Sequence, residues 1–270
     1  MSFLKMAELA GAEIVEIDDW NCCGATSAHQ INRQLADALP ARNLALAAAQ
    51  GFDAVVAPCS ACSQRLKAAR RHLAEDAGRK AEIEGVIERP VDVDLKVWNS
   101  LDFIVDHVLA AVEERGSVKF PGLKAACYYG CLLVRPPKIV EFDDPEHPTS
   151  MEKIVEAAGA QTVDWPLKID CCGGGFTLAR TDVVLKLVHD LFENALEHGA
   201  NAIVTACPMC HSNLDMRQPD VERAYGKSYR LPIYYISEIL AVALGARPRE
   251  AGIGRHFVKA DLAAMVGGTK

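Results

Sequence analysis

Short apolar and β-branched runs alternate along the chain with longer segments whose apolar residues recur at helical spacing. The short runs predict strands at Ala54–Ala57, Leu95–Trp98, Lys124–Tyr129, Ala202–Thr205 and Ile233–Ile236. Helices are predicted over Leu44–Gln50, behind Pro40, and over Asp182–His198. A proline or a hydroxyl residue precedes each helical segment, and a glycine follows it. Single strands that alternate with helices are typical of parallel α/β sheets.

This alternation occurs twice, with matching sequences. Gly11–Gly24 and Gly159–Gly173 each carry a β-branched run into a cysteine pair that is followed by glycine. Phe52–Cys62 and Ala200–Cys210 each carry a predicted strand into a CxxC motif. We therefore predict an α/β fold of two pseudo-symmetric lobes, each a small parallel sheet flanked by helices. The predicted lobes are residues 1–115 and 116–270.

Composition and charge narrow the class of protein. Half of the 270 residues are hydrophobic, which is enough for a sizeable core. The formal net charge is −7, and the Lys and Arg residues are scattered among acidic ones, so a nucleic-acid partner is not expected. Charged residues interrupt every apolar stretch before it reaches the length of a membrane span, and no secretion signal is visible at the N-terminus. We expect a cytoplasmic protein, in which ten cysteines are thiols rather than disulfides.

Nine of the ten cysteines form two sets with the same internal spacing. The first set is Cys22, Cys23, Cys59 and Cys62, and the second set is Cys131, Cys171, Cys172, Cys207 and Cys210. The distance from the pair to the CxxC motif is 37 positions in the first set and 36 in the second. Both CxxC motifs directly follow predicted strands, and Cys131 follows another, so the thiols of each set are expected to meet at the carboxyl ends of parallel strands. Cys127 has no counterpart in the repeat and is expected to be a small buried strand residue.

Thiols that meet in a reducing compartment indicate a metal site. Zinc closes its tetrahedron with four ligands, whereas the second set has five cysteines, and adjacent residues rarely aim at one ion. An iron–sulfur cluster accepts neighbouring sulfurs on different metal atoms. A vicinal disulfide is strained and would leave the CxxC motifs unexplained. The pattern therefore favours an iron–sulfur cluster over zinc, and zinc over disulfide chemistry.

Five short motifs carry these cysteines. They are CCG at Cys22–Gly24, CSAC at Cys59–Cys62, YYGC at Tyr128–Cys131, CCG at Cys171–Gly173 and CPMC at Cys207–Cys210. The doubled arrangement resembles the cysteine-rich CCG domain of the heterodisulfide reductase family, in its B-type subunit. The resemblance implies two noncubane 4Fe-4S clusters, one in each lobe and each held by five cysteines, at which a disulfide bond is cleaved or formed. It also implies iron–sulfur and flavin partner subunits, and a thiol or disulfide substrate such as a coenzyme heterodisulfide or the lipoate of a carrier protein.

The first set departs from this pattern because it lacks a fifth cysteine. Cys131 lies 40 positions before Cys171, and the same offset from Cys22 falls before Met1. We therefore expect an N-terminally shortened first lobe. Its four cysteines either hold an incomplete or conventional cluster or stay free, and we adopt the cluster as the expectation.

Two other functions stay open at this point. Related CCG subunits of lactate- or glycolate-oxidising complexes use their clusters only to relay electrons. A zinc-stabilised structural protein would have no redox chemistry. In the favoured function the clusters themselves are the reaction centres, and Tyr129, Arg135 and His211, which are near the second set in sequence, are assigned no catalytic role.

Overall fold

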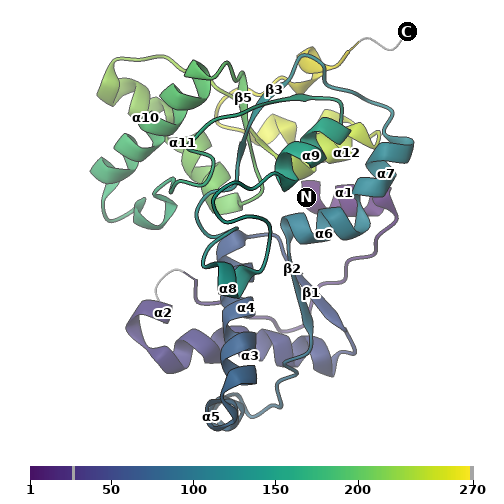
Figure 1. Cartoon of the computed structure of the whole chain (residues 1–270), viewed down its shortest axis with the longest axis vertical. Coiled ribbons are helices and arrows are strands. Elements are labelled where there is room, and N and C mark those ends of the chain that lie inside the picture. The colour runs from purple at the N-terminus through teal and green to yellow at the C-terminus, as the bar shows by residue number, and fades with distance from the viewer. Residues whose placement is uncertain (26–27, 268–270) are drawn as a thin grey trace. The chain divides into compact units, whose positions relative to one another are not determined.

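The structure, a computed structural model, describes residues 1–25 and 28–267 (Figure 1). The chain forms two compact units whose segments alternate along the sequence. Unit 1 comprises Met1–Ile14, Ile104–Cys131 and Glu146–Lys270, and unit 2 comprises Val15–Phe103 and Leu132–Pro145. The division into lobes at residue 115 stays a prediction.

Unit 1 contains a four-stranded parallel sheet with the strand order β4-β3-β5-β6. The strands are β3 (Lys124–Tyr128), β4 (Gln161–Val163), β5 (Ala202–Thr205) and β6 (Ile233–Tyr235). β5 pairs with a strand on each side and is buried at every position. In the register of the sheet, Tyr128 lies opposite Thr205, and Thr205 lies opposite Tyr235. Three neighbouring strands therefore end level with one another at their carboxyl ends.

Helices pack around this sheet. They are α1 (Ser2–Ala10), α7 (Leu109–Arg115), α9 (Ser150–Ala157), α10 (Thr181–Glu197), α11 (Pro208–Tyr225), α12 (Ile236–Ala243) and α13 (Pro248–Ala251), with 3₁₀ turns at η1 (Gly174–Phe176), η2 (Ile253–Arg255) and η3 (Leu262–Met265). α10 shows why these segments form helices that face the core: Val184, Val188 and Leu191 recur at helical spacing and are all buried. α6 (Ser100–His107) contains a boundary between the two units. Among the described residues, no helix has both the length and the apolar composition that a membrane crossing needs.

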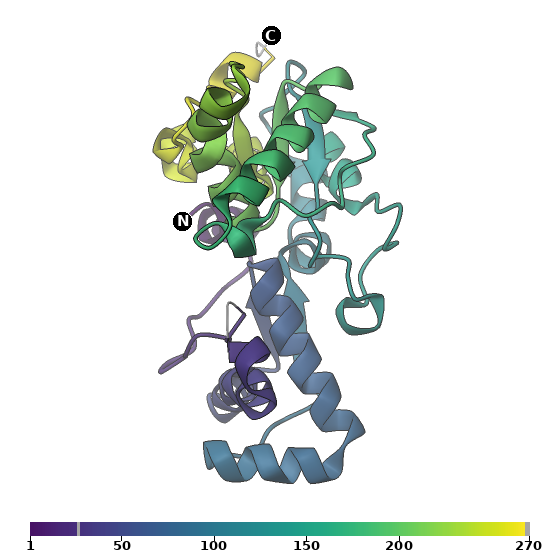
Figure 2. The same ribbon diagram turned by 90° about the vertical axis from the view of Figure 1, so that its left-hand side faces the viewer.

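Unit 2 is built on two parallel strands, β1 (Ala54–Ala57) and β2 (Lys96–Asn99). Its helices are α2 (Ala28–Ile31), α3 (Arg33–Ala49), α4 (Ser60–Glu75), α5 (Ala77–Ile87) and α8 (Pro137–Val140). A hydrophobic core joins α3, α4, α5 and β2 through Leu44, Leu73, Ile83 and Val97. α5 runs across the end of α4 (Figure 2).

The predicted fold class is confirmed, because both sheets are parallel and helices flank them. β1 and β5 have the predicted bounds, and the other three predicted strands differ from the structure by one residue at one or both ends. The helix expected behind Pro40 begins earlier, at Arg33. Asn32 caps it, because Asn32 Oδ1 accepts hydrogen bonds from the backbone N–H groups of Gln34 (2.7 Å) and Leu35 (3.2 Å).

The β-branched run in Gly11–Gly24 is not a strand in the structure. No strand pairs with it among the described residues, and Val15 is 54% exposed. Side chains of α3 hold its end instead: Asn21 N donates to Asn43 Oδ1 (2.9 Å), and Asn43 Nδ2 donates to the carbonyl of Asn21 (2.8 Å). This reciprocal pair fixes the backbone directly before the first cysteine pair.

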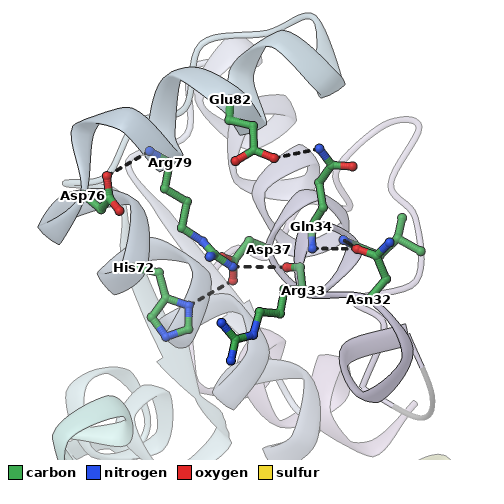
Figure 3. A network of polar contacts seen from close by, with 9 residues as sticks. Asn32, Arg33, Gln34, Asp37, His72, Asp76, Arg79 and Glu82 are labelled. Atoms are coloured by element: carbon green, nitrogen blue, oxygen red, sulfur yellow. Dashed lines mark hydrogen bonds and ion pairs between the residues drawn. The ribbon is translucent and has the colours of Figure 1, made fainter.

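A buried carboxylate, Asp37, joins three helices of unit 2 (Figure 3). Asp37 lies on α3, and its side chain is 2% exposed. His72 Nδ1 on α4 lies 3.0 Å from one carboxylate oxygen, and Arg79 Nε on α5 donates to the other. Burial of an unpaired charge destabilises the folded chain. The ion pair with Arg79 therefore offsets the cost of burying the Asp37 carboxylate.

Candidate functional site

The second cysteine set begins at the carboxyl ends of two neighbouring strands. Cys131 follows the end of β3 by three positions, and Cys207 and Cys210 lie at the start of α11, directly after β5. Because β3 and β5 are parallel and adjacent, their carboxyl ends meet at the same edge of the sheet.

Hydrogen bonds bring the adjacent pair, Cys171 and Cys172, to this edge. Tyr128 Oη at the end of β3 donates to the carbonyl of Asp170, the residue before the pair (2.6 Å). Asn213 Nδ2 on α11 donates to the carbonyl of Cys172 (2.6 Å). The loop that carries the pair is thus tied to both elements that carry the other three cysteines.

The sulfurs of the second set are in contact, and each member of the adjacent pair has a different partner. Cys172 Sγ lies 3.6 Å from Cys210 Sγ, and Cys210 also hydrogen-bonds with Cys207. Cys171 hydrogen-bonds with Cys131. All five are free thiols. A centre with several metal atoms accepts this arrangement, whereas a single four-coordinate ion would leave one sulfur over.

Hydrogen bonds between the thiols shift the pKa values of their two partners in opposite directions. The Cys131 thiol lowers the pKa of Cys171 to about 6, and the Cys210 thiol lowers the pKa of Cys172. The same two hydrogen bonds raise the pKa values of Cys131 and Cys210. In each contact the hydrogen bond favours one thiol as the proton donor and the other as the acceptor. Thiolates are the form of cysteine that binds metal, so metal atoms can take the place of the shared protons.

The first set repeats this geometry with four cysteines. Cys23 Sγ lies 3.0 Å from Cys62 Sγ, as Cys172 contacts Cys210, so in both sets the second cysteine of the pair meets the second cysteine of the CxxC motif. Cys62 also hydrogen-bonds with Cys59. The hydrogen bond from the Cys62 thiol lowers the pKa of Cys23 to about 6. The duplication seen in the sequence is thus also a duplication of sulfur contacts.

Backbone groups supply partial positive charge to both sets. Gly24 N donates to Cys22 Sγ (3.4 Å), and Gly173 N donates to Cys171 Sγ (3.3 Å). Cys59 and Cys207 are the N-cap residues of α4 and α11. The N-terminus of a long helix carries the positive end of its dipole, which stabilises thiolates there.

Other residues near the second set have ordinary structural contacts. Cys127 is confirmed as a buried strand residue, since it lies in β3 and is 0% exposed. The Tyr129 hydroxyl donates to Glu152 and accepts a hydrogen bond from the backbone N–H of Met151 (2.7 Å). His211 is buried, and its Nε2 lies 3.0 Å from the carbonyl of Ile233.

Sequence reasoning missed Gly130, although the YYGC motif places a glycine directly before Cys131. Gly130 has a φ of +65°, and a Cβ at this position would lie 3.1 Å from Cys210 Sγ. We expect Gly130→Ala to displace this sulfur and to lower the iron that stays bound through anaerobic purification. The left-handed backbone adds a loss of about 1–2 kcal/mol in the free energy of unfolding.

Gly199→Ala is the matched control, because Gly199 has a φ of +83° and no atom lies within 4 Å of an added Cβ. This variant should lose comparable stability and keep its iron. Equal iron contents, measured by mass spectrometry in the two variants, would contradict the close-contact argument.

The chain is similar to a known protein family and to several known proteins. A family model described as a cysteine-rich domain (CCG) matches residues 2–67 and 125–215. The chain is 31% identical over 262 residues to the 8-methylmenaquinol:fumarate reductase membrane anchor subunit of Wolinella succinogenes, with 96% of this chain and 91% of that protein covered. It is 30% identical over 231 residues to the B-type subunit of the ferredoxin:CoB-CoM heterodisulfide reductase of Methanosarcina mazei, with 82% and 75% covered. It is 23% identical over 252 residues to a probable glycolate oxidase iron-sulfur subunit of Bacillus subtilis, with 90% and 50% covered.

A solved structure of a hypothetical protein from Helicobacter pylori is also similar in fold. The TM-score is 0.72 at 13% sequence identity, and the match covers 96% of this chain and 49% of that chain. The chain thus spans about half the length of this structural relative, and at this identity the likeness concerns the fold alone.

Proposed function

Because the chain belongs to the cysteine-rich CCG domain family, which includes the B-type subunits of heterodisulfide reductases, we propose that it is the iron–sulfur subunit of a heterodisulfide-reductase-like complex that oxidises or reduces thiol and disulfide sulfur. The observation that carries this proposal is the meeting of five cysteine sulfurs at the ends of β3 and β5. A four-coordinate zinc ion would leave the fifth sulfur without a metal bond, whereas an iron–sulfur cluster with several iron atoms accepts it.

In this proposal each cysteine set is the ligand set of one cluster. The ligands of the second cluster are Cys131, Cys171, Cys172, Cys207 and Cys210, and those of the first are Cys22, Cys23, Cys59 and Cys62. A noncubane 4Fe-4S cluster held by these cysteines would supply one-electron chemistry and an iron site for a substrate sulfur.

The residues of the chain itself position and tune these sites. Amide N–H groups at Gly24 and Gly173 donate to ligand sulfurs, which favours the more negative, reduced state of the site. In the second set, Cys172, Cys207 and Cys210 are buried, whereas Cys171 is exposed. We propose that a substrate sulfur approaches from the Cys171 side, while the buried cysteines face away from water.

The proposed substrate is a thiol or disulfide, either a coenzyme heterodisulfide or the lipoate of a carrier protein. The proposed partners are iron–sulfur and flavin subunits that exchange electrons with the two clusters. Support for a multi-subunit assembly comes from the names of the relatives, several of which are subunits of reductases.

A second candidate is an electron-relay subunit in which the clusters carry electrons and bind no substrate. Two relatives favour it, since the protein of Wolinella succinogenes is named for fumarate reduction and that of Bacillus subtilis for glycolate oxidation. The first set also favours it, because a centre with four cysteine ligands is the usual form of an electron carrier.

Electron paramagnetic resonance distinguishes the two candidates. The full chain is purified without oxygen, oxidised, and mixed in turn with dihydrolipoamide and with a sulfonated alkanethiol. For sulfur chemistry we expect a brown protein whose oxidised signal changes on addition of at least one thiol. A signal that no thiol alters, but that a reductant removes, indicates the relay. A colourless protein with stoichiometric zinc would overturn both.

A further inference from the structure

A second group of metal-binding side chains lies in unit 1 and contains no sulfur. It consists of His211 on α11, Glu238 on α12 and His256, which follows η2. One ligand atom from each of the three side chains lies within 4.8 Å of the other two. His256 Nε2 is 2.9 Å from Glu238 Oε1. Residues from three separate segments, 45 positions apart at the extremes, are thus gathered at one point.

Neighbouring groups hold each of these side chains in place. The His211 ring stacks on Tyr235, with ring centroids 3.9 Å apart and planes 7° from parallel, and its Nε2 contacts the carbonyl of Ile233. Glu238 Oε2 accepts a hydrogen bond from the backbone N–H of Tyr235 (2.9 Å). Imidazoles and carboxylates that ligate metals are typically oriented by such outer hydrogen bonds.

The segment that carries His256 is fixed by a buried carboxylate. Asp215 on α11 is 2% exposed and accepts hydrogen bonds from the backbone N–H groups of Phe257 (2.7 Å) and Val258 (3.0 Å). This contact sets the position of the His256 backbone relative to α11, and therefore relative to His211. The three ligand atoms are brought together by a scaffold of backbone hydrogen bonds rather than by chance contacts of flexible side chains.

One polar atom of this cluster has no hydrogen-bond partner among the described residues. The side chain of His256 is 3% exposed, and its Nδ1 is buried without a hydrogen-bond partner. A buried polar atom without a partner is rare and points to a ligand or an ion. The cluster also borders a cavity of about 270 Å³, whose wall includes His211, Asp215, Tyr235, Glu238, Arg255 and His256. An ion bound here would have three protein ligands and an open side.

From this geometry we propose that His211, Glu238 and His256 form a mononuclear site for a divalent transition-metal ion, separate from both cysteine sets. Two imidazoles and one carboxylate suit Zn²⁺ or Fe²⁺ and do not suit Ca²⁺ or Mg²⁺, which prefer oxygen ligands throughout. The ion joins α11, α12 and the segment after η2, and its open coordination position faces the cavity, where water or a small anion completes the shell.

X-ray absorption at the zinc edge tests this site on the full, cluster-loaded chain with one equivalent of Zn²⁺. We expect nitrogen and oxygen ligands at about 2.0–2.1 Å with the scattering pattern of imidazole. Cysteine-bound zinc would give sulfur at about 2.3 Å instead, so the spectrum distinguishes the two locations. A spectrum with sulfur ligands alone would overturn the proposal, whatever iron the cysteines hold.

Variants locate the ion. Glu238→Gln keeps an acceptor for Tyr235 and is expected to weaken Zn²⁺ binding at least about 100-fold in competition with a chelating dye. His198→Asn is the matched control, because His198 is exposed at the end of α10 and should leave the affinity unchanged. Equal affinities in Glu238→Gln and the unmodified chain would overturn the site and leave a buried ion pair. If Glu238→Gln does not fold, the spectrum of the unmodified chain decides alone.

Discussion

Replacement of Cys172 by serine is expected to abolish iron binding by the second cysteine set. Cys172 is buried, its Sγ contacts Cys210, and its carbonyl is held by Asn213, so the chain cannot easily move another sulfur into its place. A serine hydroxyl is a poor ligand for iron compared with a thiolate. If both sets are loaded, the iron of the anaerobically purified protein should fall by about half, with a matching loss of visible absorption.

Cys127→Ala is the control for this experiment. Cys127 is equally buried but lies within β3, where its carbonyl accepts a hydrogen bond from Trp165 Nε1 (2.9 Å). Its replacement should leave the iron content unchanged. An unchanged iron content in Cys172→Ser would show that the proposed ligand set is wrong, and a loss in Cys127→Ala would show that the count of five ligands is wrong.

Removal of Arg79 is expected to destabilise the chain more than any other single change to the Asp37 network. Arg79→Leu removes the ion pair of a carboxylate that is 2% exposed, and leaves His72 as its remaining side-chain hydrogen-bond partner among the described residues. Loss of one member of a buried ion pair costs about 2–4 kcal/mol, because the other charge stays buried. Urea unfolding of the full chain, followed by circular dichroism, measures this loss as a lower transition midpoint.

A double-mutant cycle separates the buried charge from simple loss of packing. Asp37→Asn combined with Arg79→Leu removes the unpaired charge, so the double variant should be more stable than Arg79→Leu alone. Lys80→Ala is the control, since Lys80 and Glu84 form a half-buried pair at 3.7 Å on the same helix and the change should be within about 0.5 kcal/mol. A double variant less stable than Arg79→Leu would refute the role given to the charge.

Local patterns were sufficient to predict five of the six strands that the structure describes, with β4 (Gln161–Val163) missed, and to group the cysteines into two sets. β1 and β5 are short apolar runs bounded by turn residues, and their CxxC motifs follow at once, so the repeat also placed both motifs at sheet edges. The contact of Cys23 with Cys62 repeats that of Cys172 with Cys210 because the spacing between pair and CxxC is nearly the same in both sets.

Contacts between distant polar residues were beyond such patterns. The start of α3 depended on a single side chain, Asn32, whose cap allowed the helix to begin before Pro40. Asp37 and Arg79 stand 42 positions apart, and neither has a periodic signal. His211 and His256 likewise come from different segments, and only the folded chain shows that both lie beside Glu238.

The alternation of segments between the units has a consequence for folding order. α1, at the start of unit 1, packs against α12, near the other end of the chain, and Ser2 Oγ lies 2.8 Å from Ser237 Oγ. The contact between α1 and α12 thus has a high sequence separation. During synthesis it can form only after more than two hundred further residues have been added. Unit 2 can complete its own core as soon as residue 145 is made, whereas the five-cysteine set of unit 1 needs α11, which ends at Tyr225. We expect the two ligand sets to become competent for metal at different times.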